Sequence, residues 1–139
     1  QVAPTIKPAV LELGGKGPII VCDPIDWEET IDGVLTQAFA RKAEVCFAGT
    51  RLFLPAKMHD RFVADLRAKA EKIPMGNPLD GRTQLGPLMT AQRLHEIVDQ
   101  VREAKAAGAT VVCGGEKAMK PGLEKGNFMP PTILNLQER

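Results

Sequence analysis

Several residue types that support common functions are missing or rare in this chain of 139 residues. It contains no serine, which excludes a Ser-His-Asp hydrolase. It contains no tyrosine, and aromatic residues make up only 4%, so we expect no surface that stacks nucleic-acid bases. The two histidines, His59 and His95, lie in no cluster of metal-binding residue types, and the sequence therefore predicts no metal site.

Charge and hydropathy argue against two further classes of protein. The net charge is only +1, and both signs are interspersed, so no basic surface for nucleic acid is expected. No apolar run approaches the roughly 20 residues that a transmembrane helix needs. The N-terminus does not resemble a signal peptide either. The sequence therefore predicts neither a nucleic-acid partner nor a membrane partner.

The cysteines indicate a reducing compartment. Cys22, Cys46 and Cys113 are odd in number and far apart, and no CxxC pair occurs, so a disulfide framework is not expected. We therefore predict a cytoplasmic location. The chain begins at Gln1 and reaches a glycine-rich motif within its first 15 residues, which indicates a piece of a longer protein.

The pattern of apolar residues predicts one α/β domain over residues 1–139. Short apolar runs predict strands at 18–22, 51–54, 110–113 and 131–136. Apolar residues at helical spacing predict helices at about 27–41, 57–72 and 90–107. Asp26 and Thr90 are the expected N-caps, and Gly108 is expected to end the last helix. This alternation predicts a layered domain with a largely parallel sheet flanked by helices.

Two short motifs hold the residues best suited to chemistry. Glu12 lies in LELGGK at 11–16, and Cys46 lies 34 positions later in EVCFAGTR at 44–51. A single Cys in an apolar run is commonly an inert core residue, and a single Glu is commonly a surface charge. Together, however, a thiolate can attack a carbonyl group and a carboxylate can activate water. The pair therefore predicts acyl chemistry in two steps, covalent capture followed by hydrolysis.

The glycine-rich bend at 14–17 does not match a phosphate-binding loop. A P-loop needs a Gly five positions before its Gly-Lys pair and a Ser or Thr after it, but those positions hold Val10 and Gly17. No GxGxxG motif occurs in the chain. Lys16 could contact a phosphate, although a role in the packing and hydrogen bonding of the bend is the alternative.

The two motifs, together with GNPLDGRTQLGPLMT at 76–90 and GNFMPPTIL at 126–134, closely resemble the aldehyde dehydrogenase superfamily. The resemblance covers nearly the whole chain. It implies that residues 1–139 form part of an aldehyde-dehydrogenase-like catalytic domain and that the cofactor-binding domain is absent from this chain. It also implies NAD(P)-dependent oxidation of a small-molecule aldehyde to a carboxylic acid, through a thiohemiacetal and a thioester on Cys46. Cys46 would be the nucleophile and Glu12 the general base.

The same resemblance implies an NAD or NADP cofactor, a homo-oligomeric parent enzyme, and the backbone N–H of Cys46 as an oxyanion donor. Glu12 favours hydrolysis over transfer of the acyl group to coenzyme A, because members that use coenzyme A commonly lack this base. Arg93 and His95 could approach the adenosine end of a cofactor or simply form an exposed helix face.

One segment departs from the family pattern. Arg41–Glu44 stands where the family commonly has Asn-x-Gly-Gln, and Ala43 in place of Gly restricts the backbone before the cysteine. A different class of function also stays open: as an isolated piece, the chain could be a catalytically silent interaction or oligomerisation module. The identity of the aldehyde and the choice between NAD and NADP are not determined by these residues.

Overall fold

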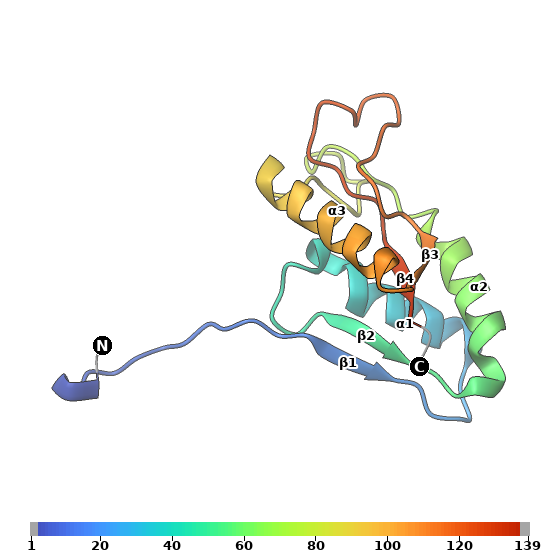
Figure 1. Ribbon diagram of the computed structural model, residues 1–139, viewed down its shortest axis with the longest axis horizontal. Helices are drawn as coiled ribbons and strands as arrows, with labels where there is room; N and C mark the ends of the chain where they lie inside the picture. Colours follow the sequence, from blue (N-terminus) through green and yellow to red (C-terminus); the bar gives the residue numbers. More distant parts are fainter. Residues whose placement is uncertain (1–2, 137–139) are drawn as a thin grey trace.

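The computed structural model describes residues 3–136 and has the α/β architecture that the sequence predicts (Figure 1). Its helices are α1 (Trp27–Phe39), α2 (His59–Ala70) and α3 (Ala91–Ala106), with short 3-10 segments η1 (Ala3–Thr5), η2 (Ala40–Ala43) and η3 (Ala56–Met58). Its strands are β1 (Gly17–Ile20), β2 (Gly49–Phe53), β3 (Thr110–Cys113) and β4 (Ile133–Asn135). Within the described residues, no helix combines the length and the apolar character that crossing a membrane requires.

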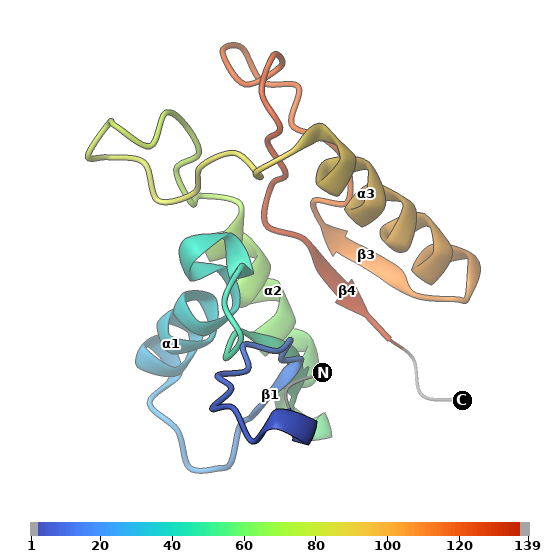
Figure 2. The ribbon, with the colours of Figure 1, turned by 90° about the vertical axis from the view of Figure 1, so that its left-hand side faces the viewer.

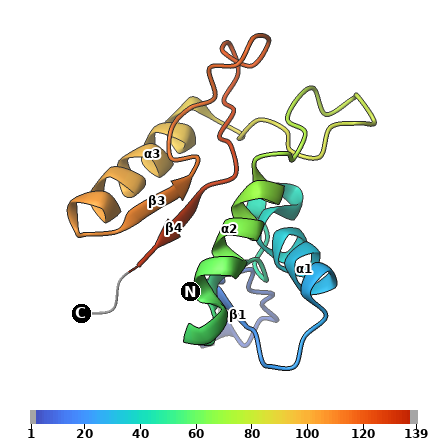
Figure 3. The same ribbon diagram turned by 90° about the vertical axis from the view of Figure 1, so that its right-hand side faces the viewer.

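The strands form two separate pairs. β1 and β2 are parallel, with Ile19 beside Leu52, and α1 makes the crossover between them. β3 and β4 are antiparallel, with Val111 beside Leu134. Residues 114–132 connect this second pair as a loop without a helix, so the chain returns in the opposite direction. Figures 2 and 3 show α3 lying along the β3–β4 pair, and Figure 3 shows α1 and α2 side by side.

The ends of the helices follow the predicted caps. The Glu29 N–H donates to Oδ1 of Asp26 at 2.9 Å, and the Arg93 N–H donates to Oγ1 of Thr90 at 3.1 Å. Each bond satisfies a backbone donor that the first turn of a helix leaves without an intrahelical partner. Gly108 follows α3 with a φ of 101°, a left-handed conformation that glycine adopts without strain.

The main core lies between α1, α2 and the β1–β2 pair. Its buried residues lie on α1, on α2 and in the segments next to β1 and α2: Val21, Ile31, Val34, Met58, Phe62 and Leu66. Ile19 of β1 and Leu52 of β2 are partly buried and pack against them. Ile31 and Phe62 are completely buried. Trp27 closes the edge of this core with its ring centroid 5.5 Å from that of Phe62, and the Arg61 guanidinium lies 4.3 Å above the Trp27 ring.

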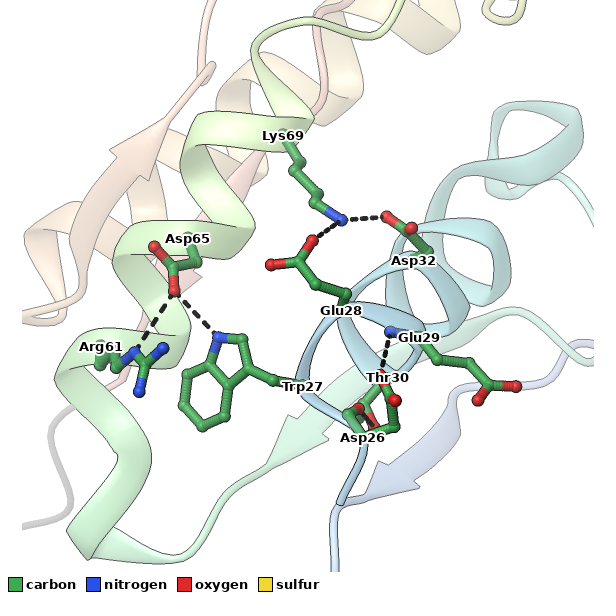
Figure 4. A network of polar contacts seen from close by, with 9 residues as sticks. All are labelled: Asp26, Trp27, Glu28, Glu29, Thr30, Asp32, Arg61, Asp65 and Lys69. Carbon is green, nitrogen blue, oxygen red and sulfur yellow. Dashed lines mark hydrogen bonds and ion pairs between the residues drawn. The ribbon is translucent and has the colours of Figure 1, made fainter.

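Polar contacts fasten α1 to α2 at the rim of this core (Figure 4). Nε1 of Trp27 donates to Oδ2 of Asp65 at 2.9 Å. Nζ of Lys69 on α2 lies 2.7 Å from a carboxylate oxygen of Glu28 and 2.6 Å from one of Asp32. These contacts fix the position of α1 and therefore of the segment that leaves its C-terminal end.

The N-terminal arm, residues 6–16, runs outward from the start of β1, and its first residues lie away from the packed body (Figure 1). Its apolar side chains face solvent: Val10 is 90% exposed, Leu11 74% and Leu13 71%. Neighbouring large apolar residues on a surface usually mark a contact with another segment or protein.

Candidate functional site

Glu12 and Cys46 line the same open hollow, which has a volume of about 600 Å³. Residues 12–16 of the arm form one wall, residues 43–48 form another, and Arg93 of α3 also lines it. Ligand sites commonly enclose 300–1,000 Å³, so the hollow is large enough for a small molecule. The structure thus brings together the two residues that the sequence singles out.

Cys46 lies at the tip of a tight turn that leads into β2. The Ala48 N–H donates to the Val45 carbonyl at 3.1 Å, which places Cys46 and Phe47 at the two central positions. Ala48 is only 3% exposed and anchors the turn, whereas Cys46 and Phe47 are exposed. Cys46 is therefore accessible to a dissolved molecule, in contrast to the buried Cys113.

The glycine-rich bend packs against this turn. A Cβ atom added to Gly15 would lie 1.7 Å from the carbonyl oxygen of Cys46, so only glycine allows the two main chains to approach so closely. Next to it, Lys16 has a φ of 79°, and its carbonyl accepts a hydrogen bond from Nε of Arg51 at 3.1 Å. Lys16 therefore contributes its main chain to the bend, which agrees with the packing alternative, and it also lines the hollow.

Before Cys46 the chain forms a left-handed turn. Arg41, Lys42 and Ala43 have φ values of 52°, 63° and 59°, and none of them is glycine. The left-handed conformation costs such residues about 1–2 kcal/mol each. Ala43 thus adopts the conformation for which the family's usual glycine is suited, and it does so with strain. The turn also ends α1 at Phe39 and not at residue 41, where the sequence predicts the end.

The turn is held by an ion pair between Nζ of Lys42 and Oε2 of Glu44, 2.7 Å apart. Glu44 lines the hollow together with Cys46. In the family pattern Asn-x-Gly-Gln, Lys42 occupies the variable position and Glu44 stands where Gln is common, and nothing in their spacing indicates that they pair.

Arg93 joins the site, whereas His95 does not line the hollow. Arg93 lies in the first turn of α3 and forms an ion pair with Glu96 at 3.1 Å. Its side chain is 51% exposed, which agrees with the exposed helix face that the sequence offers as one alternative. That the outer face of this turn borders the cysteine loop was not visible in the sequence.

The glycine-rich bend at 14–17 does not resemble the turn of a dinucleotide-binding site. Such sites place a glycine-rich turn at the N-terminus of a helix, but the bend at 14–17 leads into β1. The residues that directly precede α1, α2 and α3 are Asp26, Met58 and Thr90, and none of them is a glycine. Within residues 3–136, His, Cys, Asp and Glu side chains also form no group of three that could hold a metal ion.

Comparison with known proteins gives one consistent result. The betaine aldehyde dehydrogenases of Vibrio vulnificus and Brucella anthropi are 37% and 40% identical to this chain over 132 and 134 residues. These matches cover 95% and 96% of this chain but 27% and 28% of the two relatives. The chain thus spans little more than a quarter of their length.

Solved structures give the same result. Betaine aldehyde dehydrogenase from Staphylococcus aureus, in complex with NAD+, superimposes with a TM-score of 0.89 at 33% identity, over 95% of this chain and 26% of that one. The sequence profile of the Aldehyde dehydrogenase family matches residues 1–138. Because this match runs over almost every residue and the fold agrees with it, the chain belongs to the aldehyde dehydrogenase family.

Proposed function

We propose that this chain supplies the nucleophile and the general base of an enzyme that oxidises an aldehyde to a carboxylic acid with NAD+ or NADP+. The observation that supports it is the shared hollow of Glu12 and Cys46, with Gly15 packed against the main chain of the cysteine. The curated relatives are named betaine aldehyde dehydrogenases, which favours an aldehyde as substrate. The NAD+ bound in the S. aureus structure favours NAD+ as the cofactor.

In the first step, the Cys46 thiolate attacks the carbonyl carbon of the aldehyde. A carbon–sulfur bond forms, and the electron pair of the C=O π bond moves to oxygen, giving a thiohemiacetal. The exposed tip of the turn allows this approach, and the backbone N–H of Cys46 is our candidate donor to the developing oxyanion.

In the last step, water hydrolyses the thioester. Glu12 accepts a proton from the water, and the oxygen of that water attacks the acyl carbon. The carbon–sulfur bond then breaks and releases the acid and the Cys46 thiolate. The oxidation between these steps requires a hydride acceptor, which NAD+ or NADP+ would supply when bound. We assign no residue of this chain to binding that cofactor.

The test is an aldehyde oxidation assay on the natural protein that contains this chain. We expect reduced cofactor to form with at least one member of an aldehyde panel that includes betaine aldehyde, and Cys46→Ala to abolish it. Cys22→Ala is the matched control, because Cys22 is also an exposed free cysteine but does not line the hollow. Activity that survives Cys46→Ala would contradict the proposal.

A second candidate is a catalytically silent interaction module. The exposed apolar residues of the arm favour it, because they offer a surface to another segment or protein. In that case, the natural protein would oxidise no aldehyde with or without Cys46, while charged substitutions at Leu11 and Leu13 would change its association state.

We also propose a cytoplasmic, homo-oligomeric enzyme. The three cysteines are free thiols, which fits a reducing compartment. Light scattering on the natural protein after size-exclusion chromatography would measure its oligomeric state, and a monomer would contradict this part.

A further inference from the structure

A large apolar residue directly follows each of the two residues suited to chemistry. Leu13 comes after Glu12, and Phe47 comes after Cys46. All four residues line the same hollow. Leu13 is 71% exposed and Phe47 is 68% exposed. Most of the surface of both apolar residues is therefore open to a molecule that occupies the hollow.

Main-chain contacts hold the segments of these two apolar residues side by side. A Cβ on Gly15 would lie 1.7 Å from the Cys46 carbonyl oxygen, and one on Gly17 would lie 3.6 Å from the Phe47 carbonyl oxygen. Single exposed apolar residues are normal, but two that border one concave site usually mark a surface that binds another molecule. Because Phe47 follows the nucleophile directly and lines the same hollow as Leu13, a substrate held at Cys46 lies beside this apolar surface.

The charged residues that line the hollow balance one another. They are two carboxylates, Glu12 and Glu44, and two cations, Lys16 and Arg93. Glu44 and Arg93 also each form an ion pair with a residue that does not line the hollow. A charged substrate gains no net attraction from such a lining, and it loses hydration where it touches apolar side chains. The lining therefore favours a neutral substrate over a charged one.

We propose that Leu13 and Phe47 bind the hydrocarbon body of the substrate and make the enzyme selective for neutral aldehydes with an alkyl or aryl chain. Each methylene group that is buried against these residues should strengthen binding by about fourfold. This inference rests on the proposed function, and it names the substrate class that the proposed function leaves open. An aromatic face also attracts a quaternary ammonium group, so betaine aldehyde is the competing substrate in the test.

The test measures kcat/KM of the natural protein that contains this chain for propanal, hexanal and betaine aldehyde. Hexanal has three more methylene groups than propanal, so its kcat/KM should be about 10- to 60-fold higher. Phe47→Ala should lower this ratio by about three- to tenfold and Leu13→Ala by about two- to fivefold, whereas a general loss of folded enzyme would lower both rates equally. Phe53→Ala is the matched control, because Phe53 is 50% exposed but does not line the hollow, and it should leave the ratio unchanged.

Equal kcat/KM values for hexanal and propanal, a ratio that both Phe47→Ala and Leu13→Ala leave unchanged, or a preference for betaine aldehyde over hexanal would overturn the inference.

A second measurement needs no cofactor and separates this inference from the proposed function. In a Cys22→Ala background of the natural protein, p-nitrophenyl hexanoate should acylate Cys46 at least about tenfold faster than p-nitrophenyl acetate, with the modified residue identified by peptide mass spectrometry. Phe47→Ala should reduce that preference. A protein that shows this result but oxidises no aldehyde would contradict the proposed function alone. If neither ester acylates Cys46, the proposed nucleophile is wrong, and the inference is then decided by whether hexanamide protects this thiol from iodoacetamide better than acetamide does.

Discussion

Gly15 and Cys46 touch through their main chains, and a Cβ on Gly15 would stand 1.7 Å from the Cys46 carbonyl oxygen. This contact joins the arm that carries Glu12 to the turn that carries the thiol. Because Glu12 is only three positions from Gly15, the contact also sets where the carboxylate lies relative to Cys46. The glycine of the bend is therefore required by packing at the site as well as by local turn geometry.

We predict that Gly15→Ala displaces the arm and impairs any reaction that needs both Glu12 and Cys46. A misplacement of about 1 Å can cost roughly 10²-fold in rate, so we expect a loss of about 10- to 100-fold in hydrolysis of an activated ester such as p-nitrophenyl acetate. Gly14→Ala is the control, since a Cβ there meets nothing within 4 Å. Equal effects of the two substitutions would argue against the importance of the contact.

Glu12→Gln separates capture from hydrolysis without a cofactor. In a Cys22→Ala background, p-nitrophenyl acetate should acylate Cys46 and release about one equivalent of nitrophenolate per chain in a burst. The steady rate should then fall by roughly 10²–10⁴-fold, because the amide cannot accept a proton from water. Intact mass spectrometry should detect the trapped acetyl group. A steady rate equal to that of the parent would show that Glu12 is not the base.

We predict that this chain alone binds neither NAD+ nor NADP+ measurably. The glycine-rich bend at 14–17 leads into a strand, so the backbone N–H groups of a helix N-terminus are not offered to a pyrophosphate there. Isothermal titration calorimetry checks this prediction. A dissociation constant in the micromolar range would mean that the cofactor site lies within these residues.

Reactivity should differ among the three cysteines. Burial raises the pKa of the Cys113 thiol above its ordinary value of 9.0, so Cys113 should react most slowly with iodoacetamide near neutral pH. The folded chain binds this proton more tightly than the unfolded chain does. The free energy of unfolding should therefore fall as the pH rises above about 9 and through the raised value. Urea titrations at several pH values would measure this slope, and Cys113→Ala should reduce it.

The core contact between α1 and α2 should dominate stability. Phe62 is completely buried, and Phe62→Ala should lower the free energy of unfolding by about 3–5 kcal/mol. Leu79→Ala is the control, because Leu79 is 93% exposed, and its effect should stay within about 0.5 kcal/mol. Urea denaturation followed by circular dichroism checks both. A small effect of Phe62→Ala would mean that this core does not hold the chain together.

Local sequence patterns determined much of this fold. Helical spacing of apolar residues placed α1, α2 and α3, and the side chains of Asp26 and Thr90 cap α1 and α3 as predicted. Apolar runs placed the four strands close to their observed bounds. These features depend on residues within a few positions of one another, so they can be predicted directly from the sequence.

Other features were decided by contacts between distant segments. The antiparallel return of β4 depends on where a long loop brings the chain, which no local pattern specifies. By residue type, the segment Arg41–Ala43 favours a right-handed helix, but all three of its residues have a left-handed conformation. Two fixed points flank this segment: α1, which is fastened to α2, and the turn that is anchored at Ala48. The sequence by itself therefore determined the elements and the two residues suited to chemistry. Only the tertiary structure decided that Gly15 meets Cys46 and that Lys42 pairs with Glu44, because both contacts require packed elements to hold the main chain in place.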